Sequence, residues 1–221
     1  MRQTFVTLAT AASALWVANA QALIIDSFDT DASVIITGAA PATDSANTAD
    51  SGGGMIGDRT ITVNKTAGPA GAVNAAIAEV GGGLLGMSNG PVTNSDIIAN
   101  WVFGLTDLTE GGTATGIFLA LPNPIDNDLE VSFSINGGAA YTELFPDGSS
   151  GMDFFVPFAS IPGDASAATS FQVSFSDGDA WDAQIDFIET RPETPSVPVP
   201  GTLALLGLGL TGLGLRRRKR G

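Results

Sequence analysis

Residues 128–144 read DLEVSFSINGGAAYTEL, a stretch in which apolar and polar side chains alternate. Successive side chains of an extended chain point to opposite faces, so Leu129, Val131 and Phe133 share one face, while Glu130 and Ser132 share the other. The Asn-Gly-Gly sequence at 136–138 tolerates positive φ and predicts a tight turn. The stretch therefore predicts a β-hairpin with one buried face.

Similar short runs recur along the chain, with turn residues between them. Further strands are expected at 97–103, 116–121, 152–158, 171–176 and 183–189. The chain contains 28 Gly and 12 Pro and only 14% charged residues, a composition that makes amphipathic helices scarce. We therefore predict an all-β fold, a two-sheet, jelly-roll-like β-sandwich that forms one domain over residues 23–191.

The predicted domain is strongly acidic. All 23 acidic residues lie between positions 26 and 193, where the basic residues are only Arg59, Lys65 and Arg191, which gives a net charge of −20. Such a field repels nucleic acid and anionic membranes and attracts divalent cations. We expect no nucleic-acid partner. An acidic extracellular protein without any specific cation is the alternative interpretation.

Cysteine and histidine are both absent from the sequence. Their absence removes thiolate and imidazole groups, and with them the usual zinc and copper ligands. It also excludes hydrolysis by a Ser-His-Asp triad. We predict that the protein is not an enzyme and requires no cofactor.

The N-terminal segment at 1–22 reads MRQTFVTLATAASALWVANAQA, with one arginine, an apolar stretch and then small residues. This order is typical of a cleavable signal peptide, so signal peptidase is an expected partner. Signal peptidase requires small residues at the first and third positions before the cut, and both Ala18-Asn19-Ala20 and Ala20-Gln21-Ala22 meet this requirement. The mature chain is therefore predicted to begin at Gln21 or Leu23. An uncleaved anchor is the alternative, but the apolar stretch is short.

Three successive segments follow the predicted domain. Residues 192–200 form a proline-rich linker, residues 201–215 an uncharged stretch rich in Leu and Gly, and residues 216–221 a basic tail. The uncharged stretch predicts a short transmembrane helix of about 22 Å. The positive-inside rule places the tail in the cytoplasm and the acidic domain outside the inner membrane. The basic residues are Arg216, Arg217, Arg218, Lys219 and Arg220.

This C-terminal order resembles the tripartite PEP-CTERM sorting signal. The motif comprises Val197, Pro198, Val199, Pro200, Gly201 and Thr202, and Pro198-Val199-Pro200 stands where the family has Pro-Glu-Pro. The resemblance implies cleavage by an exosortase and transfer of the domain to the cell surface or the extracellular matrix. Hosts of this system are typically Gram-negative bacteria that make exopolysaccharide or a biofilm matrix.

A second resemblance covers the last predicted strands of the domain. The segments FFVPFASIP at 154–162, FQVSF at 171–175 and DAQIDFIE at 182–189 follow one another in this order. They resemble the final strands of galactose-binding-like jelly rolls, which include many carbohydrate-binding modules. The resemblance implies a jelly-roll fold and raises polysaccharide binding as an expectation.

Aspartates near the two ends of the domain are candidates for a structural Ca²⁺ site. Asp26, Asp29 and Asp31 adjoin the first strand and Asp186 lies in the last, and these edges often meet in related jelly rolls. Carboxylate and backbone oxygens are the ligands that Ca²⁺ prefers. The alternative is that Asp186 only faces solvent. A second acidic cluster, at positions 177, 179 and 182, lacks the spacing of an EF-hand and is interpreted as a turn.

Four aromatic residues are candidates for stacking on a sugar ring, namely Trp101, Tyr141, Phe145 and Trp181. Trp181 lies in an Asp-rich loop and is the strongest candidate, although aromatic residues of a β-sandwich usually belong to the core. Glu130 and Glu143, expected to face each other near the hairpin, are an example of a carboxylate pair that a glycosidase could use, and two solvated, inert acids are the alternative.

Taken together, the sequence predicts a non-enzymatic envelope or matrix protein that binds polysaccharide. A purely structural matrix protein without a ligand is the alternative, and a glycan hydrolase is a further one.

Overall fold

The computed structural model describes residues 22–50, 54–149, 153–176 and 180–193. These residues form 14 strands and four short 3-10 turns, and no α-helix occurs in them. None of the helical segments in these ranges could cross a bilayer. The sorting motif, the apolar stretch, the basic tail and all but the last residue of the signal peptide predicted at 1–22 lie outside the described residues.

One layer of the molecule is a six-stranded antiparallel sheet. Its four central strands alternate between buried and more exposed side chains, as the sequence pattern predicts. From edge to edge they are β10 (Tyr141–Phe145), β9 (Leu129–Ile135), β12 (Ala168–Ser176), β7 (Asn94–Thr106), β4 (Asp58–Ala67) and β3 (Ala42–Thr48).

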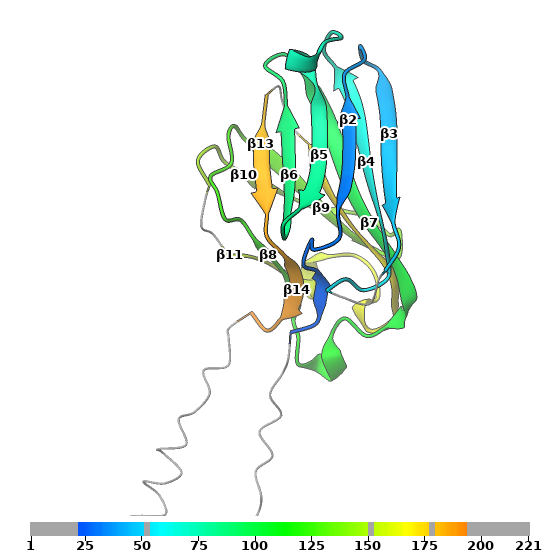
Figure 1. Cartoon of the computed structure of the whole chain (residues 1–221). Coiled ribbons are helices and arrows are strands. Elements are labelled where there is room, and N and C mark those ends of the chain that lie inside the picture. Colours follow the sequence, from blue (N-terminus) through cyan, green and yellow to red (C-terminus); the bar gives the residue numbers. More distant parts are fainter. Residues whose placement is uncertain (1–21, 51–53, 150–152, 177–179, 194–221) are drawn as a thin grey trace, which may run out of the picture.

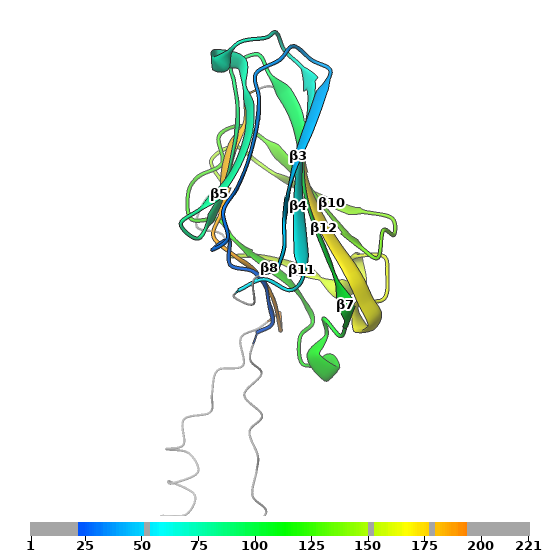
Figure 2. The same ribbon diagram turned by 45° about the vertical axis from the view of Figure 1, so that its right-hand side comes forward.

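Two four-stranded antiparallel sheets make up the rest of the fold. Figure 1 shows the first of them in front of β9 and β7, and Figure 2 shows the two layers separated. The first contains β13 (Asp182–Ile185), β6 (Leu84–Asn89), β5 (Ala76–Gly81) and β2 (Ala32–Ile36). The second contains β1 (Ile24–Asp26), β14 (Ile188–Arg191), β8 (Gly116–Ala120) and β11 (Asp153–Pro157). The 3-10 turns are Ala72–Asn74 (η1), Glu110–Gly112 (η2), Phe158–Ser160 (η3) and Ala165–Ala167 (η4).

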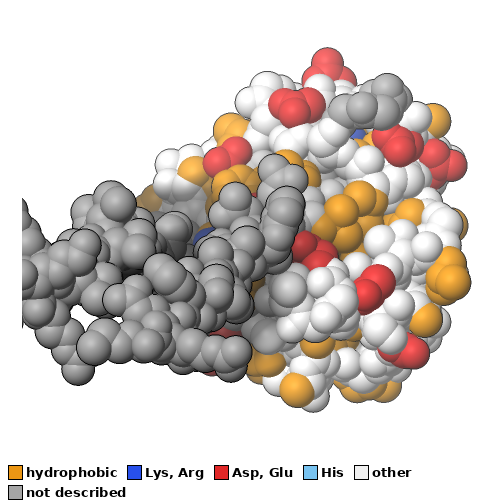
Figure 3. Space-filling view, turned by 90° about the horizontal axis from the view of Figure 1, so that it is seen from below, with side chains coloured by type: hydrophobic (Ala, Val, Ile, Leu, Met, Phe, Trp, Pro, Cys, Tyr) orange, Lys and Arg blue, Asp and Glu red, His pale blue; other side chains and the backbone are white. Residues whose placement is uncertain are grey.

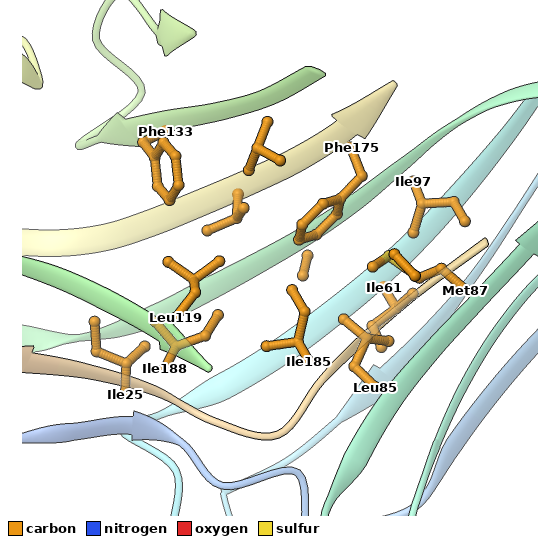
Figure 4. Packing of buried hydrophobic residues seen from close by; sticks show 14 of the residues in the cluster. Ile25, Ile61, Leu85, Met87, Ile97, Leu119, Phe133, Phe175, Ile185 and Ile188 are labelled. Carbon is orange, nitrogen blue, oxygen red and sulfur yellow. The ribbon is translucent and has the colours of Figure 1, made fainter. Parts of the chain in front are cut away.

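The core lies between the layers. Figure 4 shows Phe133, Phe175 and Ile97 of the six-stranded sheet pointing toward Leu119 and Ile185 of the opposite sheets. All five side chains are buried. The stacked rings of Trp101 and Phe171, with centroids 5.7 Å apart, extend the same core. The all-β, jelly-roll-like sandwich predicted from the sequence is therefore confirmed.

The hairpin that decided the fold class forms as predicted. β9 and β10 pair antiparallel, with Tyr141 opposite Phe133. Asn136 and Gly137 in the connection have φ of 55° and 65°, the left-handed conformation that the Asn-Gly-Gly sequence tolerates.

The single strand predicted at 183–189 is divided in the structure into β13 and β14, and the break falls at Asp186 and Phe187. The chain passes there from one four-stranded sheet to the other, and both residues make backbone hydrogen bonds to Ala120. Apolar and polar residues alternate from Asp182 to Phe187, and the adjacent apolar pair Phe187 and Ile188 is the sign in the sequence of this change of partner.

Candidate functional site

The outer face of the sheet formed by β2, β5, β6 and β13 is hollowed. Two adjoining depressions of about 660 and 420 Å³ share Glu79, Gly86 and Gln184. We refer to them together as the groove. Its other lining residues are Asp31, Ala32, Ser33, Ile77, Val80, Gly81, Gly82, Leu84, Met87, Ser88, Asn123, Pro124, Asp182 and Ala183.

Strand register places the polar residues of the groove in a row. Ser33 lies opposite Glu79, Glu79 opposite Gly86, and Gly86 opposite Gln184, so all four share the outer face. Adjacent strands are about 4.8 Å apart, so the row spans about 14 Å. The groove is therefore an extended surface across four strands, and its residues lie far apart in the sequence, from Ser33 to Gln184.

A second row of residues lies beside the first, two residues away on each strand. It contains Ile35, Ile77, Ser88 and Asp182, in that order across the sheet. Ile77 is half-buried and Ile35 is exposed, so the second row offers apolar surface at one end and polar groups at the other. An apolar strip beside hydrogen-bonding groups matches the make-up of a pocket for an amphipathic small ligand.

Gly86 forms the centre of the groove because it has no side chain. A Cβ added there would meet only the Glu79 carbonyl oxygen, at 3.8 Å, which is an ordinary contact. The depth of the groove therefore depends on this glycine, whereas the backbone there does not require one.

The polar groups of the groove offer both donors and acceptors. Gln184 accepts a hydrogen bond from the Asn123 side-chain amide, which leaves the Gln184 amide nitrogen free to donate. The Glu79 carboxylate is exposed and has no hydrogen-bond or ion-pair partner among the described residues. Groups of this kind bind hydroxyl-rich molecules.

The described surface offers almost no positive charge. Arg59 and Lys65 are buried at 0% and 1% exposure, and Arg191 is half-buried against Glu189. Figure 3 shows acidic side chains at several places on the face seen from below. A carboxylate-bearing ligand would therefore be repelled from the groove, which itself contains Glu79 and Asp182.

Asp26 lies inside the protein in a hydrogen-bonded ion pair. Its Oδ2 accepts from Nη1 of Arg59 at 2.8 Å and from Nε1 of Trp101 at 2.7 Å, and its Oδ1 accepts from the Phe28 amide at 2.7 Å. Arg59 also donates to the Thr30 carbonyl. The prediction that Asp26 serves as a calcium ligand is wrong, because an arginine already neutralises this carboxylate.

The edges that were expected to meet do so, since β1 pairs with β14. Asp186, however, is exposed at the bend before β14, and Asp29 accepts a hydrogen bond from Ser27. Within the described ranges no three acidic side chains come close enough to hold a metal. Calcium binding at Asp29 and Asp186 stays a prediction, and Asp177 and Asp179 lie outside the described residues.

Lys65 is a buried cation with a different kind of partner. Its Nζ donates to the backbone carbonyls of Gly38 at 2.8 Å, Pro69 at 2.8 Å and Asn74 at 2.6 Å. One ammonium group thereby joins two connections, the one between β2 and β3, which contains Gly38, and the one between β4 and β5, which contains Pro69 and Asn74. Sequence reasoning missed this role, although the alternation at 58–67 puts Lys65 on the same face as Ile61 and Val63, which is the signal that it is buried.

The aromatic residues proposed for sugar stacking lie elsewhere. Trp101, Trp181 and Phe145 are buried, Trp101 and Trp181 at 0% exposure, so their rings belong to the core and the predicted stacking roles are wrong. Tyr141 is half-exposed on β10, and its hydroxyl donates to Glu143 at 2.7 Å. This hydrogen bond raises the pKa of Tyr141 above its usual value. None of the four lines the groove.

The glutamates proposed as a catalytic pair point to opposite faces of the sheet. Glu130 lies opposite Leu144 on the outer face, whereas Glu143 lies opposite the buried Val131. The expectation that they face each other is wrong, because the pairing of the two strands is shifted by one residue from the expected register. A shift of one residue moves a side chain to the opposite face of the sheet. Two carboxylates on opposite faces cannot flank one glycosidic bond.

Comparison with known proteins identifies the C-terminus. Residues 196–219 match the model of the PEP-CTERM protein-sorting motif, in agreement with the resemblance seen in the sequence. This motif implies export, membrane anchoring before processing, and processing by an exosortase. No curated protein matches the chain in sequence.

Solved structures similar to this one include carbohydrate-binding modules, at low identity. The family 11 module from Clostridium thermocellum, in complex with a β-1,3-1,4-mixed-linked tetrasaccharide, is 12% identical, covers 77% of this chain and 95% of its own, and has a TM-score of 0.38. The module TmCBM61, in complex with β-1,4-galactotriose, is 10% identical, covers 71% and 92%, and has a TM-score of 0.30.

Proposed function

We propose that this chain is an exported cell-surface or extracellular-matrix protein, directed there by a signal peptide and the PEP-CTERM motif, whose groove binds a neutral polysaccharide without cleaving it. The groove is the observation that carries the proposal. It extends about 14 Å across four strands, and it combines hydroxyl, amide and carboxylate groups with an apolar strip. An elongated chain of sugar rings suits this shape better than a single compact ligand.

The chemistry of the groove supports a neutral glycan. Sugar hydroxyls can donate to the carboxylates of Glu79 and Asp182 and accept from the amide of Gln184 and the hydroxyl of Ser33. The apolar C–H face of a sugar ring can pack on Ile77. Uronic acid polymers, by contrast, would bring carboxylates next to carboxylates, with no exposed basic residue in the described surface to offset them.

A structural matrix protein without a ligand is the alternative. It would leave the groove without a role, and it predicts self-association or no interaction in place of saturable glycan binding. A hydrolase is disfavoured because Glu130 and Glu143 lie on opposite faces of the sheet.

Gly86→Leu is the variant that tests the proposal. The added side chain would fill the centre of the groove, so affinity for the bound glycan should fall at least tenfold, about 1.4 kcal/mol. Binding of the purified exported protein would be measured by calorimetry against a panel of neutral, uronic acid and amino-sugar polymers. Calcium would be present first and then removed with EDTA, which also tests the predicted Ca²⁺.

Gly104→Leu is the matched control. Gly104 is exposed on β7, outside the groove, and has open space around its Cβ position. It should bind the glycan as the unchanged protein does. The proposal fails if no polymer binds saturably, or if both variants lose affinity equally. Reducing ends released from the bound glycan would replace it with a hydrolase.

A further inference from the structure

Leu23, the second of the described residues, is hydrogen-bonded to the domain through its backbone. The Leu23 amide nitrogen donates to Oε1 of Glu110 at 3.0 Å and lies 3.3 Å from Oγ1 of Thr190. The Leu23 carbonyl accepts from the Thr190 amide at 2.9 Å, and the Thr190 hydroxyl donates to the same Glu110 oxygen. A single carboxylate oxygen therefore faces the nitrogen of Leu23.

Glu110 is held in position by an unusual turn. Its φ is 51°, in the left-handed region that residues other than glycine rarely adopt. The Asp107 carboxylate accepts from the Thr109 hydroxyl and from the amides of Gly111 and Thr109, and these hydrogen bonds, the hydroxyl one first, lower the pKa of Asp107. Strained backbone of this kind is retained where the position of a side chain matters.

Glu110 has no basic side chain as a partner within the described ranges. Arg191, the basic residue of β14, pairs with Glu189 at 3.4 Å. Glu110 is half-buried, and among the described residues its carboxylate accepts from a backbone amide and a hydroxyl, both neutral. A half-buried carboxylate without a cation is more stable if its partner carries a positive charge.

We propose that signal peptidase cleaves after Ala22 and that the new α-ammonium group of Leu23 forms an ion pair with Glu110. Hydrolysis adds water across the Ala22–Leu23 peptide bond, so Ala22 leaves as a carboxylate and Leu23 keeps the amine, which is protonated at neutral pH. Three N–H donors then face the acceptors on Glu110 and Thr190. This inference rests on the signal peptide in the proposed function.

The alternative cleavage after Ala20 would not give this arrangement. Gln21 and Ala22 would remain ahead of Leu23, whose nitrogen would stay an uncharged amide with one hydrogen. Both positions have alanine where signal peptidase requires small residues, so the sequence leaves the choice open. The contacts of Leu23 decide in favour of Ala22.

The first test is the N-terminal sequence of the exported protein, expressed from its full-length gene in a Gram-negative bacterium and read by mass spectrometry. A chain that begins at Leu23 supports the proposal. A chain that begins at Gln21 overturns it but leaves export intact. A chain that retains Met1 overturns the signal peptide as well.

The second test measures whether the charge matters. Glu110→Gln keeps a hydrogen-bond acceptor but removes the negative charge, and should lower the Tm of the Leu23 form by about 2–4 °C. Ala22→Leu should move cleavage to Ala20, because leucine is too large for that position. In that background Glu110→Gln should lower Tm by less than half as much.

Equal losses of Tm in both backgrounds would overturn the ion pair, because Glu110 would then serve only the backbone amide. Glu130→Gln, a change at an exposed glutamate on β9, is the matched control and should leave Tm unchanged.

Discussion

Asp26 and Glu79 are both carboxylates on strands, but their surroundings are opposite. Asp26 is 1% exposed and accepts hydrogen bonds from Arg59, Trp101 and the Phe28 amide. Glu79 is exposed in the groove and has no partner among the described residues. A buried carboxylate must be paired, because an isolated charge in the interior is too costly, whereas an exposed one is free to bind a ligand.

The comparison separates residues that stabilise the fold from residues available for function. The only two basic residues between positions 3 and 190, Arg59 and Lys65, are both used inside the protein. The surface therefore keeps the negative charge of the domain. If the separation holds, variants in the interior should change stability, and variants in the groove should change binding.

Arg59→Met should have the largest effect on stability. It removes the cation and leaves Asp26 charged in the core, so the free energy of unfolding should fall by about 3–5 kcal/mol. Chemical denaturation measures this loss. Adding Asp26→Asn should recover part of it, because the two residues act as one pair. If Asp26→Asn recovers none of the lost free energy of unfolding, the two residues are not coupled.

Lys65→Met should have a smaller effect of about 2–4 kcal/mol. The methionine fills similar space but leaves the carbonyls of Gly38, Pro69 and Asn74 without their donor. Denaturation again measures the loss, and glycan affinity of the folded fraction should not change. A loss of affinity with stability intact would contradict the separation of interior from groove.

Glu79→Gln should change binding and leave stability alone. The affinity for a neutral glycan should fall about threefold to tenfold, or about 0.7–1.4 kcal/mol, because a carboxylate accepts hydroxyl hydrogen bonds more strongly than an amide does. The free energy of unfolding should stay within about 0.5 kcal/mol. Glu130→Gln, on the outer face of the other layer, should change neither quantity.

Tyr141 and Glu143 form an intermediate case, in which a half-exposed carboxylate has one partner. The hydrogen bond favours the neutral phenol, so Tyr141 should ionise above pH 10.0, its ordinary pKa. The chain has a single tyrosine, so its ultraviolet absorbance reports this one group. Glu143→Gln should lower the pKa toward the ordinary value, and an unchanged titration would mean that the hydrogen bond does not form in solution.

The fold class could be predicted from the sequence because alternation and turn residues are local. The hairpin at Asn136 depends only on neighbouring residues, and the C-terminal sorting motif is a contiguous string. Partners far apart in sequence could not be predicted in this way. Nothing near Asp26 indicates that Arg59, 33 residues away, lies beside it.

The groove could not be predicted from the sequence, because its prediction depends on the pairing register of four strands. Ser33, Glu79, Gly86 and Gln184 share one row only because four strands align in one way. The error over Glu143 has the same origin, because a shift of one residue reverses the face of a strand. Trp181 is a second wrong prediction. Its position among aspartates predicts an exposed side chain, but the side chain is fully buried.

The ammonium of Lys65 has a consequence for the medium in which the domain can work. It occupies a cluster of three carbonyl oxygens that resembles the coordination of a metal ion, but it is covalently part of the chain. Its occupancy therefore obeys no mass-action law and does not vary with the concentration of any dissolved ion. A chelator that removes cations from the surroundings of a cell would leave this junction of two loops unchanged.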